Sequence, residues 1–152
     1  MSENEESDVD EVSKEKFDVW ALADELFEEL SKINKHNQKY TASVKFHVLF
    51  YNLFGDTYFD ALDTIDRAGI TRLTSPSQRA LFEVVVSSGR KFTLFEHVNY
   101  CTCQEYQQTV LGAQNQIMCE HILAIRLAQA LNKFQERQID DDALSDVFLT
   151  EI

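Results

Sequence analysis

The sequence predicts an α+β fold, with N-terminal helices, a central antiparallel β-hairpin or small sheet, and a C-terminal helix. Apolar residues recur at helical spacing from about residue 17 to residue 69. The segment 80–88 is rich in β-branched residues, and the turn sequence SGRK separates it from a second alternating segment. The helical period returns from about 117 to 134. A chain of 152 residues has the length of one ordinary domain.

Composition divides the chain into four segments. Residues 1–14 are charged and without aromatic side chains, which predicts a disordered acidic tail. Residues 15–69 form a helical region, and 70–136 hold the hairpin, a cysteine-containing segment at 101–124 and the following helix. Residues 137–152 predict an acidic short helix or tail. The net charge of −12 disfavours tight DNA binding by the chain alone, although the mildly basic middle leaves a weak contact open.

The first predicted helix is amphipathic, with an apolar stripe opposite a row of acidic residues. The stripe must be buried, either in the core of the chain itself or in a groove on a partner. We favour the core and keep the partner groove as the alternative. The stripe consists of Phe17, Trp20, Ala23, Phe27, Leu30 and Ile33.

Two shorter helices follow. The segment 42–54 is apolar over most of its girth, which predicts a buried helix, and Gly55 is placed to end it in a left-handed conformation. Thr57 and Asp60 resemble a capping box at the start of a third helix over 57–68. The apolar face of that helix is predicted to carry Phe59, Leu62 and Ile65.

The second half alternates strand and helix signals. The segment 80–88 predicts one strand of the hairpin, and 91–101 predicts the next, running directly into Cys101. A polar stretch at 104–116 predicts a short helix and then a loop. The aspartates at 140–142 predict the start of a last short helix. The helix over 117–134 is expected to bury Leu123, Leu127, Leu131 and Phe134.

All three cysteines lie between positions 101 and 119. With His121 they read Cys-x-Cys, fifteen residues, then Cys-x-His. Two local pairs of sulfur and nitrogen ligands suit tetrahedral Zn²⁺. We therefore predict one structural zinc ion bound by Cys101, Cys103, Cys119 and His121, with the second pair at the entry to a helix. The alternative is that the cysteines are buried small apolar residues.

Two other kinds of site have weaker support. A catalytic zinc site keeps a water position open beside a general base. Glu120 is a candidate base, but its place between two ligands points it away from the metal, and four protein ligands close the site. A nucleic-acid surface is the other kind, with stacking rings at Phe92, Phe95, Tyr100 and Tyr106, most of them expected in the core. Its basic candidates are Arg72, Arg79, Arg90, Lys91, Arg126, Lys133 and Arg137.

The ligand pattern, written CTC…CEHILA, resembles the SWIM zinc finger, here over 101–124. Ala124, three residues after the histidine, matches an extended form of the pattern that is typical of the small SWIM-domain proteins of the Shu complex. The segment FGDTYFDALDTIDRAGITRLTSPSQRALFEVV is also similar to that family, so the resemblance covers about 54–150. Residues 1–40 match it poorly. Ala124 is expected beside the metal, where a small residue lets its helix approach the hairpin or a partner.

The resemblance implies a non-enzymatic role in homologous-recombination DNA repair. Members of the family pair with a RecA-like recombinase paralogue and promote assembly or stability of the recombinase filament on single-stranded DNA. The chain carries neither an apolar run of membrane-spanning length nor a secretory signal, so we expect a protein of the cytosol or nucleus without a membrane partner. The resemblance further implies a nuclear location and no small-molecule substrate. The alternatives are a stand-alone nucleic-acid-binding zinc module and a SWIM protein-interaction module of another nuclear pathway.

Overall fold

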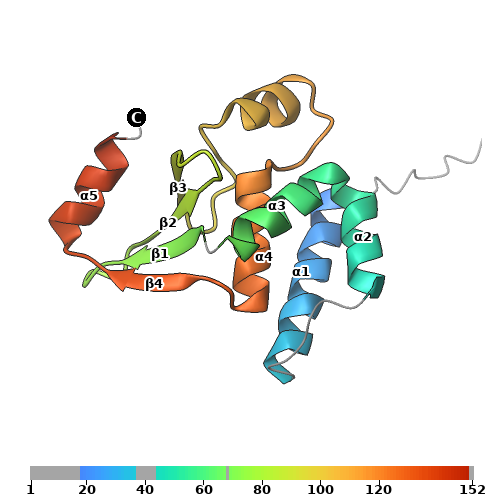
Figure 1. The fold of residues 1–152 in the computed structure, drawn as a ribbon, viewed down its shortest axis with the longest axis horizontal. Coiled ribbons are helices and arrows are strands. Elements are labelled where there is room, and N and C mark those ends of the chain that lie inside the picture. Colours follow the sequence, from blue (N-terminus) through green and yellow to red (C-terminus); the bar gives the residue numbers. More distant parts are fainter. Residues whose placement is uncertain (1–17, 37–43, 68, 151–152) are drawn as a thin grey trace, which may run out of the picture.

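The protein folds into a layer of helices against one face of a small sheet, with a further helix at the far end (Figure 1). The computed structural model describes residues 18–36, 44–67 and 69–150. The predicted α+β class is confirmed. In chain order the elements are α1 (Val19–His36), α2 (Val44–Phe54), α3 (Asp56–Asp66), β1 (Ile70–Thr74), β2 (Ala80–Val85), β3 (Lys91–Phe95), the π-helix η1 (Tyr106–Gly112), α4 (Glu120–Leu131), β4 (Gln135–Gln138) and α5 (Asp141–Thr150).

The sheet has the order β3-β2-β1-β4. Strands β2 and β3 form the predicted antiparallel hairpin, with Phe82 opposite Leu94. Gly89 takes a positive φ of 81° in its turn, which glycine adopts without a steric penalty. The predicted hairpin is therefore confirmed.

The sequence did not predict the other two strands. β1 pairs antiparallel with β2, and β4 pairs parallel with β1, so that Thr71 lies opposite Gln135. All four residues of β4 are exposed and polar, and alternation of apolar residues therefore could not reveal the strand. Its position depends on backbone pairing with a segment far away in the sequence.

Gly69 connects α3 to β1 in a crowded place. Its N–H donates to Thr64 O, and its carbonyl oxygen accepts from Val85 N–H at 2.7 Å. A Cβ atom on residue 69 would collide with the carbonyl oxygen of Val85. Only glycine allows the chain to pass β2 this closely.

Helix α4 is the central element of the helical layer. α1 and α3 pack against it, and its residues from His121 to Ile125 are all buried (Figure 1). α5 lies at the opposite end of the sheet, where Leu144 joins Leu73 and Leu81 in a small second cluster. No helix in the described part of the chain has the length and apolar character needed to cross a membrane.

The apolar stripe of α1 lies in the core. Ala23, Phe27 and Leu30 are buried, whereas Trp20 keeps 37% of its surface exposed. The helix begins after Asp18, whose carboxylate accepts the backbone N–H of Trp20 at 3.0 Å. Phe17, the expected first member of the stripe, falls outside the described residues. The core interpretation is therefore confirmed for the residues that the structure describes.

Helix α2 is buried on one face only, so the prediction of burial over most of its girth is wrong. Phe46, Phe50 and Phe54 point into the core, where Phe50 stacks on Tyr58 with ring centroids 5.4 Å apart. Val44 and Val48 on the opposite face are 79% and 51% exposed. The fold covers α2 with α1 and α3, and no described element covers its outer face. The expected start of the helix at residues 42 and 43 lies outside the described residues.

The start of α3 also differs from the prediction. Gly55 has a positive φ of 61°, but its ψ of −141° places it outside the left-handed helical region. Thr57 lies inside the helix and is buried, so the capping box with Asp60 is wrong. The expected apolar face is wrong at Phe59, which is 53% exposed, because Tyr58 occupies the core instead.

Strand β3 ends at Phe95, so the prediction that it runs directly into Cys101 is wrong. Glu96 is held by Arg72 through two hydrogen bonds of 3.1 and 2.9 Å. His97 then takes a positive φ of 63°, which breaks the extended backbone. Cys101 and Cys103 consequently lie on an irregular segment between β3 and η1.

Candidate metal centre

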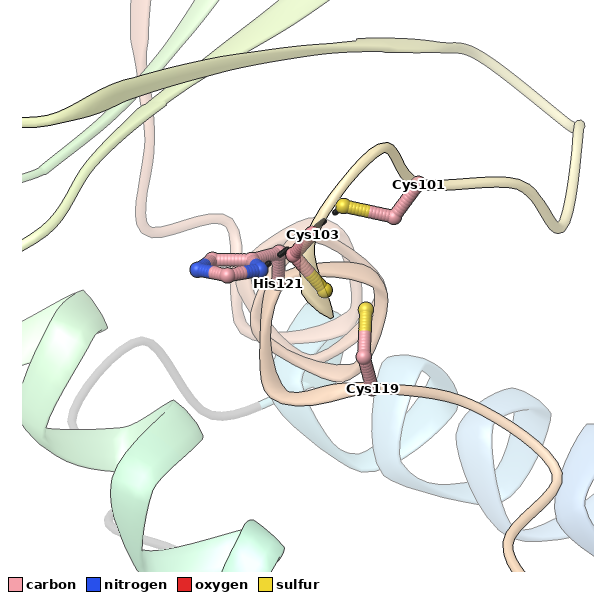
Figure 2. A group of neighbouring side chains, drawn as sticks. All are labelled: Cys101, Cys103, Cys119 and His121. Carbon is pink, nitrogen blue, oxygen red and sulfur yellow. Dashed lines mark hydrogen bonds between the residues drawn. The ribbon is translucent and has the colours of Figure 1, made fainter. Parts of the chain in front are cut away.

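The four predicted ligands meet in one buried cluster. The thiol sulfurs of Cys101, Cys103 and Cys119 and a ring nitrogen of His121 all lie within 4.8 Å of one another. Figure 2 shows these side chains converging at the N-terminal end of α4. Every residue of the cluster is buried. The tertiary structure thus brings together two local pairs that the sequence separates by fifteen residues.

The second pair lies at the entry to a helix, as predicted. Cys119 is the N-cap of α4 and has extended backbone angles, φ −83° and ψ 173°. His121 occupies the first turn of the helix. Two residues spaced by two within a helix point about 200° apart. The extended backbone of Cys119 removes this conflict, so that both side chains reach the same metal position.

The imidazole of His121 is held in place by contacts with Cys101 and Phe92. Its Nδ1 lies 3.7 Å from Cys101 Sγ, and its ring packs on Phe92 with centroids 4.1 Å apart. Its Nε2 is buried without a hydrogen-bond partner and lies 3.3 Å from Glu120 Oε1. Glu120 therefore lies beside the ring nitrogen that faces away from Cys101, and not at the metal position.

The geometry fits a tetrahedral Zn²⁺. Zinc–sulfur bonds of about 2.3 Å and zinc–nitrogen bonds of about 2.0–2.1 Å place tetrahedral ligand atoms roughly 3.5–3.8 Å apart. The 3.7 Å between Cys101 Sγ and His121 Nδ1 agrees with that spacing. Cys101, Cys103, Cys119 and His121 are thus positioned to bind one zinc ion.

The pKa values of the clustered side chains also favour binding of a cation. Hydrogen bonds from Cys101 and Cys119 lower the pKa of Cys103, whereas Cys101 and Cys103, together with burial, raise the pKa of Cys119. Burial opposes a charge on His121, but Cys101 and Cys103 raise the pKa of this imidazole to about 9. One thiolate is therefore favoured and further ones are resisted, because like charges repel in a buried site. A bound divalent cation would stabilise three thiolates and a neutral imidazole.

A network of hydrogen bonds supports the first ligand pair. The backbone N–H of Tyr106 donates to Cys103 Sγ at 3.2 Å, and its hydroxyl donates to Asn99 O at 2.7 Å. The side-chain amide of Asn99 donates to Ile117 O at 3.2 Å. These bonds connect the segment before the first pair to the segment before the second. Such contacts around a metal site hold its ligands in the orientation that binding requires.

Glu105 is a supporting residue that sequence reasoning missed. Its Oε2 accepts the backbone N–H of Glu120 at 3.2 Å, in the first turn of α4. Its Oε1 lies 3.4 Å from the hydroxyl of Thr57 on α3. A carboxylate at this position satisfies a free backbone donor and interacts favourably with the helix dipole. No signal in the sequence pointed to Glu105, because its partners are distant along the chain.

Ala124 lies one turn after His121 and is completely buried. α4 packs against α3 and α1, and no surface of Ala124 is exposed at this position. A small side chain leaves room for neighbouring elements to approach α4 closely. The structure therefore places Ala124 in the helix-packing core near the metal centre.

The predicted nucleic-acid candidates do not form one free basic surface. Five of the seven basic residues form ion pairs with acidic residues of the chain, and Arg90 lies over the ring of Phe92 at 5.3 Å. Phe92 and Tyr106 are buried, while Phe95 packs on Phe148 and Tyr100 is half exposed. The paired basic residues are Arg72, Arg79, Lys91, Arg126 and Arg137.

The comparisons with known proteins agree with this site. The family model of the SWIM zinc finger matches residues 98–128, which include all four ligands and Ala124. Zinc finger SWIM domain-containing protein 7 of Homo sapiens is 33% identical over 135 residues, covering 86% of this chain and 92% of the relative. The protein of that name from Danio rerio is 37% identical over 95 residues, covering 62% and 68%. A homologue from Dictyostelium discoideum is 27% identical over 117 residues, covering 76% and 75%.

No solved structure matches the chain. The assignment therefore depends on the curated relatives, on the matched finger and on the buried ligand cluster. With one-third identity over nearly the whole length of a curated relative, the chain belongs to the family of zinc finger SWIM domain-containing protein 7.

Proposed function

We propose that this protein is a non-enzymatic factor of homologous-recombination DNA repair, acting in the nucleus as the zinc-stabilised subunit of a Shu-type complex. In this role it pairs with a RecA-like recombinase paralogue. The complex promotes assembly or stability of the recombinase filament on single-stranded DNA. Family membership and the closed metal centre support the proposal.

The closed metal centre is the observation that supports a non-enzymatic role. Four protein ligands complete a tetrahedron and leave no position for a reacting water. All four ligand residues are buried. A cavity of about 330 Å³ lies between α1, α4 and the segment after β3, and none of the four ligands lines it. The zinc ion would therefore hold α4 and the preceding segment in shape, and it would bind no substrate.

The pairing of basic side chains supports a role through a partner. Non-specific DNA binding depends on free Lys and Arg side chains that neutralise phosphates. Here most of the candidate side chains already neutralise carboxylates of the same chain, as Lys91 and Arg137 do with the buried Glu83. We infer that the partner supplies most of the DNA contact.

Copurification from cells tests the proposal. We expect a tagged wild-type chain to retain a RecA-like recombinase paralogue in stoichiometric amount. The reconstituted pair should increase recombinase filament formation on single-stranded DNA, whereas the chain alone should not. Retention of an unrelated nuclear assembly without any recombinase paralogue would refute the proposal in favour of a SWIM protein-interaction module of another pathway.

A stand-alone nucleic-acid-binding module is the second candidate. It is favoured by the half-exposed Tyr100 and by Arg90 and Lys133, since none of the ion pairs in the described part of the chain includes either basic residue. This reading predicts salt-dependent binding of single strands by the purified chain, lost in an Arg90→Ala, Lys133→Ala variant. Absence of binding at low salt would exclude it.

A further inference from the structure

We propose that the outer surface of α2 and α3 binds a basic amphipathic helix of a protein partner. We call it the α2–α3 apolar surface and define it by Val44, Val48, Tyr51 and Phe59. The inference deepens the proposed function, on which it rests for the existence of a protein partner, by naming the face that binds and the chemistry that it recognises.

The four side chains form one continuous exposed surface. Positions 44, 48 and 51 recur at helical spacing and share one face of α2. Val44, Val48, Tyr51 and Phe59 are 79%, 51%, 45% and 53% exposed. Phe59 continues the surface onto α3, because its ring lies 5.3 Å from that of Tyr51. Two aromatic and two aliphatic side chains therefore face solvent side by side.

The fold of this chain does not need these residues. The core face of α2 is satisfied by Phe46, Phe50 and Phe54, which pack on α1 and α3. A helix that is buried on only one side normally carries polar residues on the exposed side. α2 instead carries apolar residues on both. A contiguous exposed apolar surface of this kind marks an interaction site in a soluble protein.

The charges beside the surface select the partner. Asp56, Asp63 and Asp66 are exposed on α3 and recur at helical spacing on the face that carries Phe59. Arg67 neutralises one of them, through a 2.8 Å ion pair with Asp63. Lys45 is the exposed basic residue on α2. The acidic excess favours a partner segment that carries Lys or Arg beside its apolar residues, since complementary charges steer association and select among partners.

The same charges disfavour two other occupants. A twofold dimer through this surface would bring the aspartates of one copy against those of the other. Each copy also carries a net charge of −12, which opposes self-association. An anionic membrane surface attracts basic segments and repels acidic ones. A helix is the natural form of the partner, because the apolar stripe of an amphipathic helix matches an exposed apolar face formed by side chains at helical spacing.

Copurification with the recombinase paralogue provides the first test. A Val48→Glu, Phe59→Glu variant should retain at least tenfold less paralogue than the wild type. Because both side chains are exposed, the variant should keep its circular dichroism and bound zinc. The matched control is Leu111→Glu, Leu149→Glu, which introduces the same charges at exposed apolar positions on η1 and α5 and should retain the paralogue fully. Full retention by the Val48→Glu, Phe59→Glu variant would overturn the inference and leave the proposed function intact.

A synthetic peptide provides the second test and does not depend on the paralogue. The probe is a labelled helical peptide of about 18 residues with one leucine face flanked by lysines, compared with a peptide in which glutamates replace the lysines. Fluorescence anisotropy should show saturable binding of the basic peptide only, lost in the Val48→Glu, Phe59→Glu variant. Equal binding of both peptides, or equal binding by the wild type and the variant, would overturn the inference. If the wild type retains no paralogue, the proposed function fails and the peptide result alone decides the inference.

Charge-reversal variants measure how much the aspartates of α3 contribute to peptide binding, apart from the apolar contacts. Asp56→Lys with Asp66→Lys should weaken binding of the basic peptide at least fivefold, while Asp142→Lys with Asp146→Lys on α5 makes the same change in net charge and should leave it unaltered. Equal effects of the two variants would overturn the charge argument. Concentration-dependent dimerisation of the wild type, abolished by Val48→Glu with Phe59→Glu, would replace the partner helix by a second copy of the chain.

Discussion

Replacing Ala124 by leucine should destabilise the protein without removing its zinc. Ala124 is completely buried on α4, a helix that packs against both α1 and α3. Leucine adds three carbon atoms at a position that has no free surface. Neither backbone can retreat easily, because α4 is fixed at its N-terminus by the metal ligands and packed along its length by α1 and α3.

The size of the effect follows from overpacking. Inserting extra methylene groups into a packed core typically costs about 1–3 kcal/mol. For a domain of about 150 residues, 1 kcal/mol corresponds to roughly 2–4 °C in Tm. We therefore expect Tm to fall by about 2–12 °C. The four ligands are unchanged, so the metal content should stay near one zinc ion per chain.

Thermal unfolding followed by circular dichroism, with zinc measured by atomic emission on the same sample, tests this prediction. Ala143→Leu provides the matched control, because the same change falls on an exposed position of α5 and should alter the free energy of unfolding by no more than about 0.5 kcal/mol. An unchanged Tm in Ala124→Leu would refute the close packing around Ala124. Loss of zinc in that variant would refute the separation of helix packing from metal binding.

Three further predictions concern the metal centre and the α3–β1 connection. Cys119→Ser should lose zinc and part of the native circular dichroism of the protein, because the segment from β3 to α4 should no longer fold. A structural zinc site contributes about 10–16 kcal/mol, as much as the stability of a whole domain. Zinc affinity, measured by chelator competition, should rise from about pH 6 to about pH 8, since binding must displace protons from the thiols and from His121, whose pKa the cluster raises to about 9; a flat profile would contradict this. Gly69→Ala should lower stability by at least about 1–3 kcal/mol in chemical denaturation, because the added methyl group meets the carbonyl oxygen of Val85; a neutral effect would show that β2 can move away.

A control for the cysteine variant tests whether the effect comes from the metal. Met118→Leu changes a buried neighbour of Cys119 with little change in volume, so it should keep its zinc and lose less than about 1.5 kcal/mol. A Cys119→Ser variant that stays folded in the presence of a chelator would show that apolar packing alone holds α4 in place.

The structure corrected the sequence prediction where the neighbouring elements, and not the local pattern of apolar residues, decide which side chains are buried. The girth of α2 is apolar, which normally indicates burial, yet Val44 and Val48 remain exposed because no described element of the chain reaches them. The apparent capping box at Thr57 failed because α3 begins at Asp56, so Thr57 lies inside the helix and its hydroxyl contacts Glu105. β3 was predicted too long, since alternation continues past Phe95 while the backbone turns at His97.

The sequence by itself determined the metal ligands, the hairpin and the helical periods. Each of these depends on residues that are close along the chain: Cys101 with Cys103, Cys119 with His121, and the two strands joined by the Gly89 turn. Only the tertiary structure decided where β4 pairs, which carboxylate caps α4 and which face of α2 stays open. Those features depend on contacts between distant segments, where backbone pairing and available space decide and the local pattern of side chains carries no signal.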